Sequence, residues 1–303
     1  MPNYLIKMNY DIVGDIHGHA DALEQLLQKM GYTRKGGVYY HPEGRQVLFV
    51  GDFIDRGPKI REALHLVRDM VEAGHAQAVM GNHEYNAVCF HTPHTDPTVG
   101  FFRKHSEREI HQHSETLRQF EDHKEEWESF LEWFRYLPMH LDLPECRVVH
   151  AYWKTSHIEW LKANYRGLTS EFLTMSTDKK SKAYGVVEDT LKGAEHTLPD
   201  DRFFLDKDGN KRTECRVKWW STKRERYGDV YMECPQDLHH EPLPAHVEID
   251  DYQEEVPVFF GHYWLKEPVI NEHPKSFCLD YSVAKGGKLV AARLDGGEVV
   301  VIS

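Results

Sequence analysis

The chain has 303 residues, of which 40% are hydrophobic and 28% are charged, as is typical of a soluble globular protein. Its formal net charge of -12 argues against proteins that bind long nucleic acids or anionic membranes, because those present a basic face. No hydrophobic run is long enough to cross a bilayer, and the N-terminus lacks a signal-peptide core. We therefore expect a cytoplasmic protein with no membrane partner. The five cysteines form no CxxC pair, and we expect them to be reduced.

The first ninety residues alternate predicted strands and helices. Three short hydrophobic runs, each ending at glycine, predict buried strands: Tyr10–Val13, 47–50 and 76–80. Between them, hydrophobic residues at helical spacing predict two helices that stop at Gly31 and Gly74. Asp21 and Glu24 have the spacing of a capping box at the first helix. The pattern is a βαβαβ unit, and ligands of α/β sheets bind at the carboxyl ends of the strands.

The middle of the chain is less regular. Residues 101–136 are charged, helical in pattern and rich in Trp and Phe, and we interpret them as a pair of helices covering one edge of the site. Residues 179–255 mix loops and short elements. Because we find no internal repeat, linker or low-complexity tract, we expect one domain over residues 1–303, with insertions at about 90–145 and 179–255.

Further strands are predicted in the second half of the chain. Their ranges are 147–150, 256–260, 277–279, 288–294 and 298–302. The strand at 256–260 again ends at a glycine, Gly261. The last two strands are joined by Asp295-Gly296-Gly297, which is typical of a hairpin turn.

Short polar clusters follow the ends of these strands. They are GDIHG (14–18), GDFIDRG (51–57), GNHE (81–84), His150 and Gly261-His262. Asp15 and His17 stand two apart, and an extended backbone places alternate side chains on one face, so both can bind one ion. The Asp52 carboxylate has two oxygens with which to bridge two ions. An amide oxygen and two imidazoles are available to a second ion, from Asn82, His150 and His262.

The types of ligand indicate which metals the site would bind, and each cluster also has a structural explanation. Oxygen and nitrogen ligands without thiolates suit manganese, iron, nickel or zinc better than calcium. Each cluster alone has a structural explanation, since a lone histidine such as His150 is more often a core or surface residue and GNHE is compatible with a turn. Four separate strands that each end in a metal-binding residue type favour a metal centre instead.

The motifs GDIHG, GDFIDRG and GNHE resemble the three signatures of the calcineurin-like metallophosphoesterases. The DRG and GNHE forms, and the tail FCLDYSVAKGGKLVAARL (277–294), are similar to bacterial members of the phosphoprotein phosphatase branch. That branch includes bacterial Ser/Thr and Tyr protein phosphatases, symmetrical diadenosine tetraphosphatases and the phosphatase domain of bacterial polynucleotide kinase-phosphatases. The resemblance implies an α/β fold in which two mixed β-sheets form a sandwich flanked by helices, with the metals at one edge.

The resemblance also implies how two divalent ions would be held. The first would be bound by Asp15, His17 and Asp52. The second would be bound by Asp52, Asn82, His150 and His262. Manganese is the expected metal, with iron, zinc and nickel as alternatives, and a hydroxide bridging the two ions would attack phosphorus.

Three further roles follow from the resemblance. Arg56, with Asn82, would contact the substrate phosphate, a bidentate role that suits a planar guanidinium. His83 would protonate the leaving oxygen, and Asp55 would orient His83. A purely structural histidine is the alternative for His83.

The sequence departs from the family signatures at two places bordering the inferred site. HAYW (150–153) stands where HGG is usual, and GHYW (261–264) where GHT or GHQ is usual. Tyr152 and Tyr263 are therefore candidates to stack on a nucleobase or an aryl group, although we favour simple packing. Arg216 and Lys218, in RVKWW (216–220), are candidates for a second basic phosphate contact.

Histidines are frequent, 21 in all, and several fall between residues 91 and 113. These are His91, His94, His105, His111 and His113. A lid over the site is one interpretation of this stretch. We favour the other, a solvated helical face.

The leading functional hypothesis is a metal-dependent phosphatase acting on a phosphate monoester, in a phosphoprotein or a small molecule. A second hypothesis is a hydrolase of nucleotide phosphoanhydrides or phosphodiesters, similar to the tetraphosphatase and nucleic-acid-repair relatives. A third, of another class, is a catalytically inactive metal-binding module. Loss of a ligand, of His83 or of Arg56 would indicate the third, and all are present. The substrate, the native metal and the oligomeric state stay open.

Overall fold

The computed structural model describes residues 9–205, 211–250, 252–266 and 273–303. Part of the second expected insertion, at 206–210 and 251, thus lies outside the described residues. Within these ranges, no helix has the length and hydrophobicity needed to span a membrane.

The larger of two central sheets has five strands. Their order is β17 (Glu298–Ile302), β16 (Ala291–Asp295), β1 (Tyr10–Val13), β4 (Gln46–Phe49) and β5 (Ala76–Ala78). Strands β1, β4 and β5 are parallel, with Ile12 opposite Leu48. On the other side, β16 runs antiparallel to β1 and forms a hairpin with β17, so the sheet is mixed and the predicted hairpin is confirmed.

The second sheet has four strands. Their order is β13 (Ser276–Cys278), β12 (Val258–Phe260), β7 (Arg147–Val149) and β6 (His140–Asp142). Strand β12 is parallel to both of its neighbours, and β6 is antiparallel to β7. The carboxyl ends of β7 and β12 therefore lie at the same edge of this sheet.

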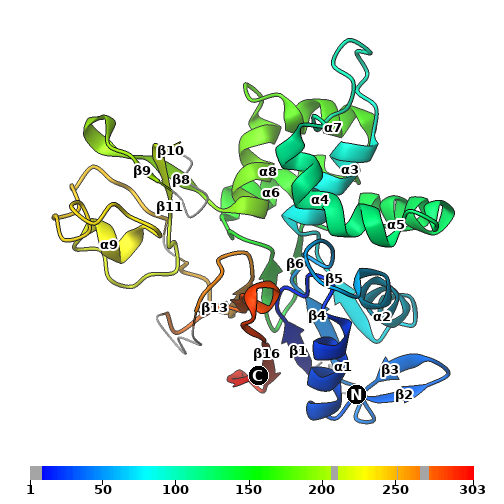
Figure 1. Cartoon of the computed structure of the whole chain (residues 1–303). Coiled ribbons are helices and arrows are strands. Elements are labelled where there is room, and N and C mark those ends of the chain that lie inside the picture. The colour runs from blue at the N-terminus through cyan, green and yellow to red at the C-terminus, as the bar shows by residue number, and fades with distance from the viewer. Residues whose placement is uncertain (1–8, 206–210, 251, 267–272) are drawn as a thin grey trace.

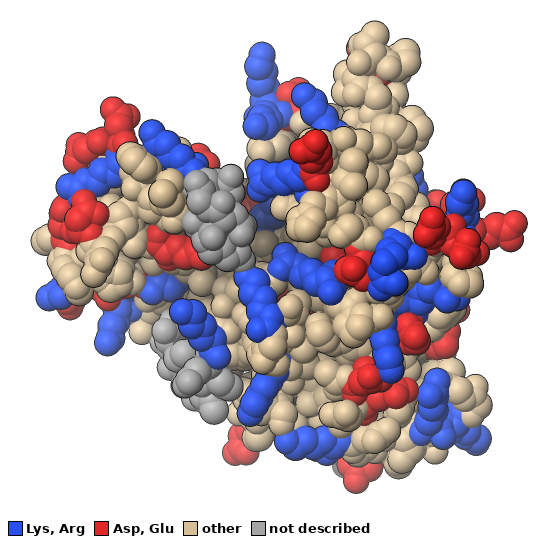
Figure 2. Space-filling view, viewed as in Figure 1, with Lys and Arg blue, Asp and Glu red and all other residues tan. Residues whose placement is uncertain are grey.

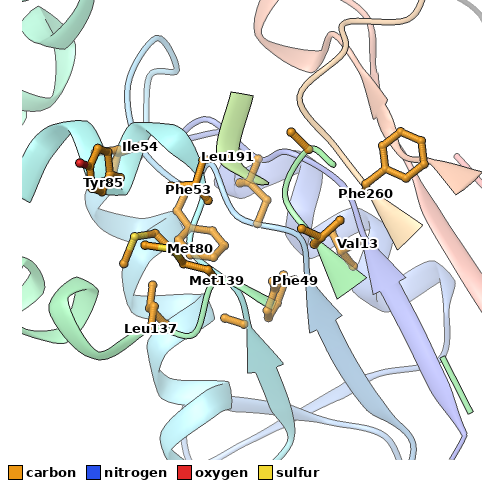
Figure 3. Close-up of a cluster of buried hydrophobic side chains, with 14 of the residues drawn as sticks. Val13, Phe49, Phe53, Ile54, Met80, Tyr85, Leu137, Met139, Leu191 and Phe260 are labelled. Carbon is orange, nitrogen blue, oxygen red and sulfur yellow. The ribbon is translucent and has the colours of Figure 1, made fainter. Parts of the chain in front are cut away.

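Alternating side chains divide the core into two parts. Ile12, Leu48 and Phe259 belong to one buried cluster that joins the two sheets. Val13 and Phe49, on the opposite face of the larger sheet, belong to a second cluster that packs against the helices (Figure 3). Two mixed sheets thus pack face to face with helices outside them, and the predicted fold class is confirmed.

Helices cover the outer face of the larger sheet and extend beyond it (Figure 1). Their bounds are α1 (Ala20–Lys29), α2 (Ile60–Glu72), α3 (Asn82–His91), α4 (Glu107–Gln119), α5 (Lys124–Tyr136), α6 (Thr155–Asn164), α7 (Ser170–Thr177) and α8 (Lys182–Lys192). The predicted helix pair between 101 and 136 is confirmed as α4 and α5.

The segment after α8 forms a lobe of short elements (Figure 1). Its elements are β8 (Glu195–Thr197), a 3-10 turn (Pro199–Asp201), β9 (Phe204–Leu205), β10 (Lys211–Arg212), β11 (Glu214–Arg216) and α9 (Tyr227–Val230). Strands β8 and β11 pair with each other, as do β9 and β10, and neither pair joins a central sheet. Three other small elements are the hairpin β2 (Thr33–Lys35) and β3 (Val38–Tyr40), the pair β14 (Asp280–Tyr281) and β15 (Lys288–Leu289), and a 3-10 turn (Val283–Lys285).

Two local predictions are wrong. The strand predicted over 288–294 is divided at Val290, because β15 pairs with β14 whereas β16 pairs with β1. The capping box is absent from α1, which begins after His19 without a side-chain cap. Asp21 instead accepts a hydrogen bond from Lys59 Nζ at 2.7 Å.

Candidate metal centre

The six predicted metal ligands lie together where strands of both sheets end. Asp15 follows β1, Asp52 follows β4, and Asn82 begins α3 after β5. From the second sheet, His150 follows β7 and His262 follows β12. All of these side chains and that of His17 are at most 9% exposed. Parallel strands deliver their carboxyl ends to one edge, so residues up to 247 positions apart become neighbours.

Two groups of side-chain atoms have metal-binding spacing, and Asp52 belongs to both. Ligand atoms of Asp52, His150 and His262 lie within 4.8 Å of one another, and so do those of His17, Asp52 and His83. Asn82 Oδ1 joins the first group, at 3.0 Å from His150 Nε2 and 2.8 Å from His262 Nδ1. The predicted bridging position of Asp52 is therefore compatible with the geometry.

Asp15 stands beside these groups rather than inside them. Its Oδ2 accepts a hydrogen bond from the backbone N–H of His262 at 3.0 Å. A Cβ at Gly261 would lie 1.8 Å from Asp15 Oδ1, so only glycine at 261 leaves room for this carboxylate. Likewise, a Cβ at Gly81 would lie 2.2 Å from Asp52 Oδ1. The glycines next to the ligands are thus required by close approach.

The donor atoms fit bound metal ions. Within the described part of the chain, Asp15 Oδ1, His17 Nε2 and His262 Nε2 are buried and have no hydrogen-bond partner. His17 Nδ1 donates to the Ile54 carbonyl at 2.9 Å, and His150 Nδ1 donates to that of Val50 at 2.8 Å. Since a carbonyl only accepts, Nε2 of His17 keeps the lone pair that a metal needs. Buried polar atoms without partners are costly, and a cation would satisfy them.

Acidic groups crowd the centre. Burial, and then the neighbouring charge of Asp280, raise the pKa of the Asp15 carboxyl well above its usual value. Asp280 is itself 2% exposed and accepts hydrogen bonds from the backbone N–H groups of Trp264 and Ser282, at 2.8 and 2.9 Å. Burial also raises the pKa of Asp280, although these bonds oppose the change. A divalent cation would offset this repulsion.

His83 forms part of a hydrogen-bonded chain beside the centre. Its Nδ1 lies 2.5 Å from Asp55 Oδ2, and its Nε2 lies 3.9 Å from Asp52 Oδ2. Burial lowers the pKa of the His83 imidazole, but the charges of Asp52 and Asp55 outweigh burial and raise it above its usual value. His83 is thus held by a carboxylate with its other nitrogen facing the metal centre, as a proton donor to a substrate would be.

The opposite oxygen of Asp55 is bound by helix α4. His113 Nδ1 lies 2.7 Å from Asp55 Oδ1, and the Thr116 hydroxyl donates to the same oxygen at 2.6 Å. His113 is 5% exposed, so our interpretation of this histidine as part of a solvated face is wrong. It is buried because α4 docks on the GDFIDRG loop. His111, two residues earlier on the helix, is exposed.

Glu84, the last residue of GNHE, joins two of the motifs. Its carboxylate accepts hydrogen bonds from the backbone N–H groups of Gly81, Asp52 and Phe53, at 2.8 to 2.9 Å. The capping-box spacing of Gly81 and Glu84 at the start of α3 is the sequence signal from which this role can be predicted. The bonds fix the loop that carries Asp52 against the helix that carries Asn82.

Left-handed backbone conformations gather at the centre. Non-glycine residues with positive φ include His17, Asp52, Asp55, Arg56, His262 and Trp264. Each such residue costs about 1–3 kcal/mol and persists only where its surroundings hold it in place. Backbone strain of this kind is typical of functional sites.

A cavity of about 490 Å³ opens beside the centre, and Arg56 forms part of its wall. The guanidinium carbon of Arg56 lies 4.0 Å from the centroid of the Trp264 ring, and Lys285 Nζ lies 3.6 Å from the same centroid. The basic residues that line the cavity are Arg56, Arg212, Arg216, Lys266 and Lys285. In Figure 2, Lys and Arg side chains border part of the hollow between the lobe and the helical part of the molecule, and Asp and Glu side chains lie on the lobe beside it. Three acidic residues, Glu195, Glu214 and Glu233, also line the cavity, and Glu195 pairs with Arg212 at 3.1 Å and with Arg216 at 3.8 Å. The wall therefore carries both charges, with basic residues in excess.

The four predicted rim residues have different positions. Arg216 and Tyr263 line the cavity, with the Arg216 guanidinium carbon 5.9 Å from the Tyr263 ring centroid. Lys218 is absent from this wall, and its Nζ donates to the Gly228 carbonyl at 2.9 Å. Tyr152 is also absent from it, because its ring packs on Trp219 and its hydroxyl donates to Asp250. Tyr263 is only 1% exposed, and its ring packs against that of Trp220 with 4.4 Å between the centroids. Of the four, only Arg216 is therefore placed to contact a substrate.

Known proteins resemble this chain in sequence and in fold. It is 50% identical over 76 residues to an asymmetrical bis(5'-nucleosyl)-tetraphosphatase, PrpE, of Halalkalibacterium halodurans, over 25% of this chain and 31% of the relative. PrpE of Oceanobacillus iheyensis is 33% identical over 150 residues, which are 48% of this chain and 56% of the relative. The chain thus spans about a third to just over half the length of these relatives.

The chain also resembles solved structures and matches a family model. A cold-active protein tyrosine phosphatase aligns over 99% of this chain and 78% of its own, at 19% identity and a TM-score of 0.52, which is a likeness of fold. The calcineurin-like phosphoesterase model matches residues 8–263, which confirms the resemblance seen in the motifs. The chain belongs to the calcineurin-like phosphoesterase family.

Proposed function

We propose that the protein is a metal-dependent phosphoesterase that hydrolyses a phosphate monoester. The observation that carries the proposal is that six buried ligand side chains meet beside a cavity whose wall contains an arginine. Three of the six have an oxygen or nitrogen atom without a hydrogen-bond partner. Family membership supports the same chemistry. The chain retains every predicted ligand together with His83 and Arg56, which an inactive binding module would not require.

The ligands divide into two sets that share Asp52. Asp15, His17 and Asp52 would hold one ion, and the other would be held by Asp52, Asn82, His150 and His262. Two divalent ions would lower the pKa of water at the site and balance charge on the phosphate oxygens. Carboxylate, amide and imidazole ligands suit manganese first, with iron, zinc or nickel as alternatives.

Side chains of the cavity wall would bind and orient the phosphate. Arg56 presents a planar guanidinium that can donate two parallel hydrogen bonds to phosphate oxygens. Its contact with the Trp264 ring limits how far the guanidinium can rotate. Arg216 would supply positive charge further from the metals, where the lobe meets the cavity.

His83 would give its proton to the leaving oxygen. The Asp55 carboxylate holds the Nδ1 side of the ring, so the Nε2–H is the one available to a substrate. An alkoxide leaves poorly unless it is protonated, and a positioned acid contributes about 10²–10⁴-fold to the rate. Since His83 also has metal-binding spacing to His17 and Asp52, a role as ligand is the competing assignment.

Hydrolysis of nucleoside polyphosphates is a second candidate. It is favoured by the excess of basic residues in the cavity wall, where five face three glutamates. The names of the relatives from Halalkalibacterium halodurans and Oceanobacillus iheyensis describe this activity in those proteins. The partly exposed ring of Phe204 in the same wall offers a surface on which a nucleobase can stack.

A hydrolysis panel with metal-loaded protein tests both candidates. The substrates are p-nitrophenyl phosphate, bis-p-nitrophenyl phosphate, phosphopeptides, diadenosine tetraphosphate and a 3′-phosphorylated oligonucleotide. We expect release of phosphate from at least one monoester, and preferential cleavage of diadenosine tetraphosphate would favour the second candidate. Absence of turnover on every substrate with manganese, nickel and iron would contradict both.

A further inference from the structure

One face of helix α4 makes a row of hydrogen bonds to the loop that follows Asp52. His113, Thr116 and Gln119 are spaced three residues apart, so they lie on the same side of the helix. Gln119 donates to the Gly57 carbonyl at 3.0 Å and accepts from the Ile60 N–H at 2.7 Å. The contacts therefore extend along the loop from Asp55 to the start of α2.

The strongest of these contacts are on Asp55. Thr116 donates to Asp55 Oδ1 at 2.6 Å and its hydroxyl accepts from the backbone N–H of Asp55 at 3.0 Å, so it holds both the side chain and the main chain. His113 Nδ1 lies 2.7 Å from the same carboxylate oxygen. With Oδ1 bound by two groups of α4, Oδ2 is turned toward His83.

Rotation of His113 is restricted by aromatic neighbours. Its ring centroid lies 5.4 Å from that of Phe90 and 5.7 Å from that of Trp127. A second histidine, His91, closes the far side, with 3.2 Å between the two Nε2 atoms. The imidazole is thus packed in the orientation that points Nδ1 at Asp55.

The loop requires such support. Asp55 and Arg56 have φ angles of 67° and 71°, a left-handed conformation that is unfavourable for residues with a side chain. Simple packing of α4 on the loop would not need a buried histidine and threonine, since buried polar groups are costly unless they are bonded. The polar face of α4 therefore supplies the hydrogen-bonding groups that the buried Asp55 carboxylate needs.

We propose that α4 acts as a clamp in which His113 and Thr116 are positioning residues for the reaction, fixing Asp55 and through it the imidazole of His83. The inference rests on the proposed function, because it assigns to α4 the orientation of the proton donor. Helix α4 lies outside the metal-ligand motifs. His113 and Thr116 would act only through Asp55 and would not contact the substrate, since neither residue faces the metal centre.

The test compares two esters that differ in their need for an acid. p-Nitrophenolate leaves readily without a proton, whereas the serine alkoxide of a phosphopeptide does not. We expect His113→Leu to lower kcat/KM for the phosphopeptide at least about tenfold more than for p-nitrophenyl phosphate, within the 10²–10⁴-fold contribution of a general acid. Thr116→Val, which keeps the shape of the side chain, should act in the same direction. His113→Asn, which keeps a donor near Nδ1, should recover part of the loss.

Two further measurements separate positioning from structural damage. His111→Leu, on the exposed side of the same helix, is the matched control and should change neither ester. In a His83→Ala background, His113→Leu should have little further effect, because the two residues act as one unit. Should His113→Leu fail to fold, as judged by circular dichroism, Thr116→Val carries the test alone.

The outcomes distinguish the clamp from the proposed function. Equal losses on both esters, or full additivity with His83→Ala, would overturn the clamp while wild-type turnover leaves the phosphoesterase in place. Wild-type protein that hydrolyses neither ester nor the 3′-phosphorylated oligonucleotide would overturn the proposed monoesterase and the clamp with it.

Discussion

The metal centre and the outer wall of the cavity lie side by side but are built differently. Ligands of the centre are buried and follow strands of the two central sheets, so the main core of the molecule holds them. The outer wall comes from the lobe, whose short strands pair only with each other, and Arg216 there is partly exposed. The proposed chemistry would thus take place on the central sheets, and the proposed substrate contacts would come from a separately built part of the fold.

This difference predicts two kinds of mutational effect. Changes at the centre should remove activity on every substrate, because all substrates need the same reaction. Changes in the outer wall should alter affinity for particular substrates, because the wall contacts only the groups beyond the reacting phosphate. The predictions below run from the largest expected effect to the smallest.

Asp52→Asn should reduce hydrolysis to background for all substrates. The carboxylate belongs to both groups of metal-binding atoms. An amide has no negative charge and only one oxygen, so it cannot bind two ions in the same way. Metal content by mass spectrometry and kcat on p-nitrophenyl phosphate measure the effect. Asp21→Asn, an exposed carboxylate bonded to Lys59, is the control and should behave as wild type. Retained activity of Asp52→Asn would place the metals elsewhere.

His83→Ala should slow alkyl phosphates by about 10²–10⁴-fold and aryl phosphates much less. The side chain is held by Asp55 with its second nitrogen toward the metal centre, as a proton donor requires. Rates for a series of esters with different leaving groups measure the effect. Equal losses across the series would instead favour His83 as a metal ligand, in line with its spacing to His17 and Asp52.

Asp11→Asn should lower stability by about 3–5 kcal/mol and leave the kinetics of the folded enzyme unchanged. Asp11 is fully buried near the start of β1, where Arg45 and Arg293 bind it at 2.8 to 3.1 Å. Burial raises the pKa of this carboxyl, but the hydrogen bonds and charges of the two arginines lower it below its usual value.

The sign of that shift sets a pH dependence. A carboxyl with a lowered pKa in the folded state stabilises the protein above its unfolded pKa of about 3.9, and this contribution disappears as the pH falls through the folded value. Urea unfolding at pH 7 and pH 3 should therefore show a smaller difference between wild type and Asp11→Asn at the lower pH. A difference that grows toward acid would contradict the assignment.

Arg216→Ala should raise KM for diadenosine tetraphosphate about tenfold, the loss of one hydrogen bond to a charged group. The same variant should change KM for p-nitrophenyl phosphate little, because that ester has no second phosphate. Lys218→Ala is the matched control, since the Lys218 ammonium binds the Gly228 carbonyl. Equal effects of Arg216→Ala on both substrates would remove the distinction between centre and outer wall.

The sequence predicts those site residues that directly follow a strand. A glycine beside each strand end allowed Asp15, Asp52 and His262 to be picked out, because the rule that parallel strands deliver their ends to one edge needs no further knowledge of the fold. Glu84 was also accessible in principle, through its capping-box spacing to Gly81.

Contacts across long separations were not predictable in this way. His113 and Asp55 are 58 residues apart, and nothing in the charged, histidine-rich sequence of α4 distinguishes His113, which is buried, from His111, which is exposed. Lys218 and Arg216 are both cationic, yet only the position of β11 in the lobe decides which of them faces the cavity. Burial of this kind depends on how separate elements dock.

The central claim is that Asp52 joins two metal sites, and a metal titration tests it most directly. Metal-free protein is titrated with manganese in a calorimeter and the bound ions are counted per chain. We predict two ions per chain, with phosphatase activity that follows occupancy. Binding of fewer than two ions to folded protein, or full occupancy without hydrolysis of any phosphate ester, would contradict the account.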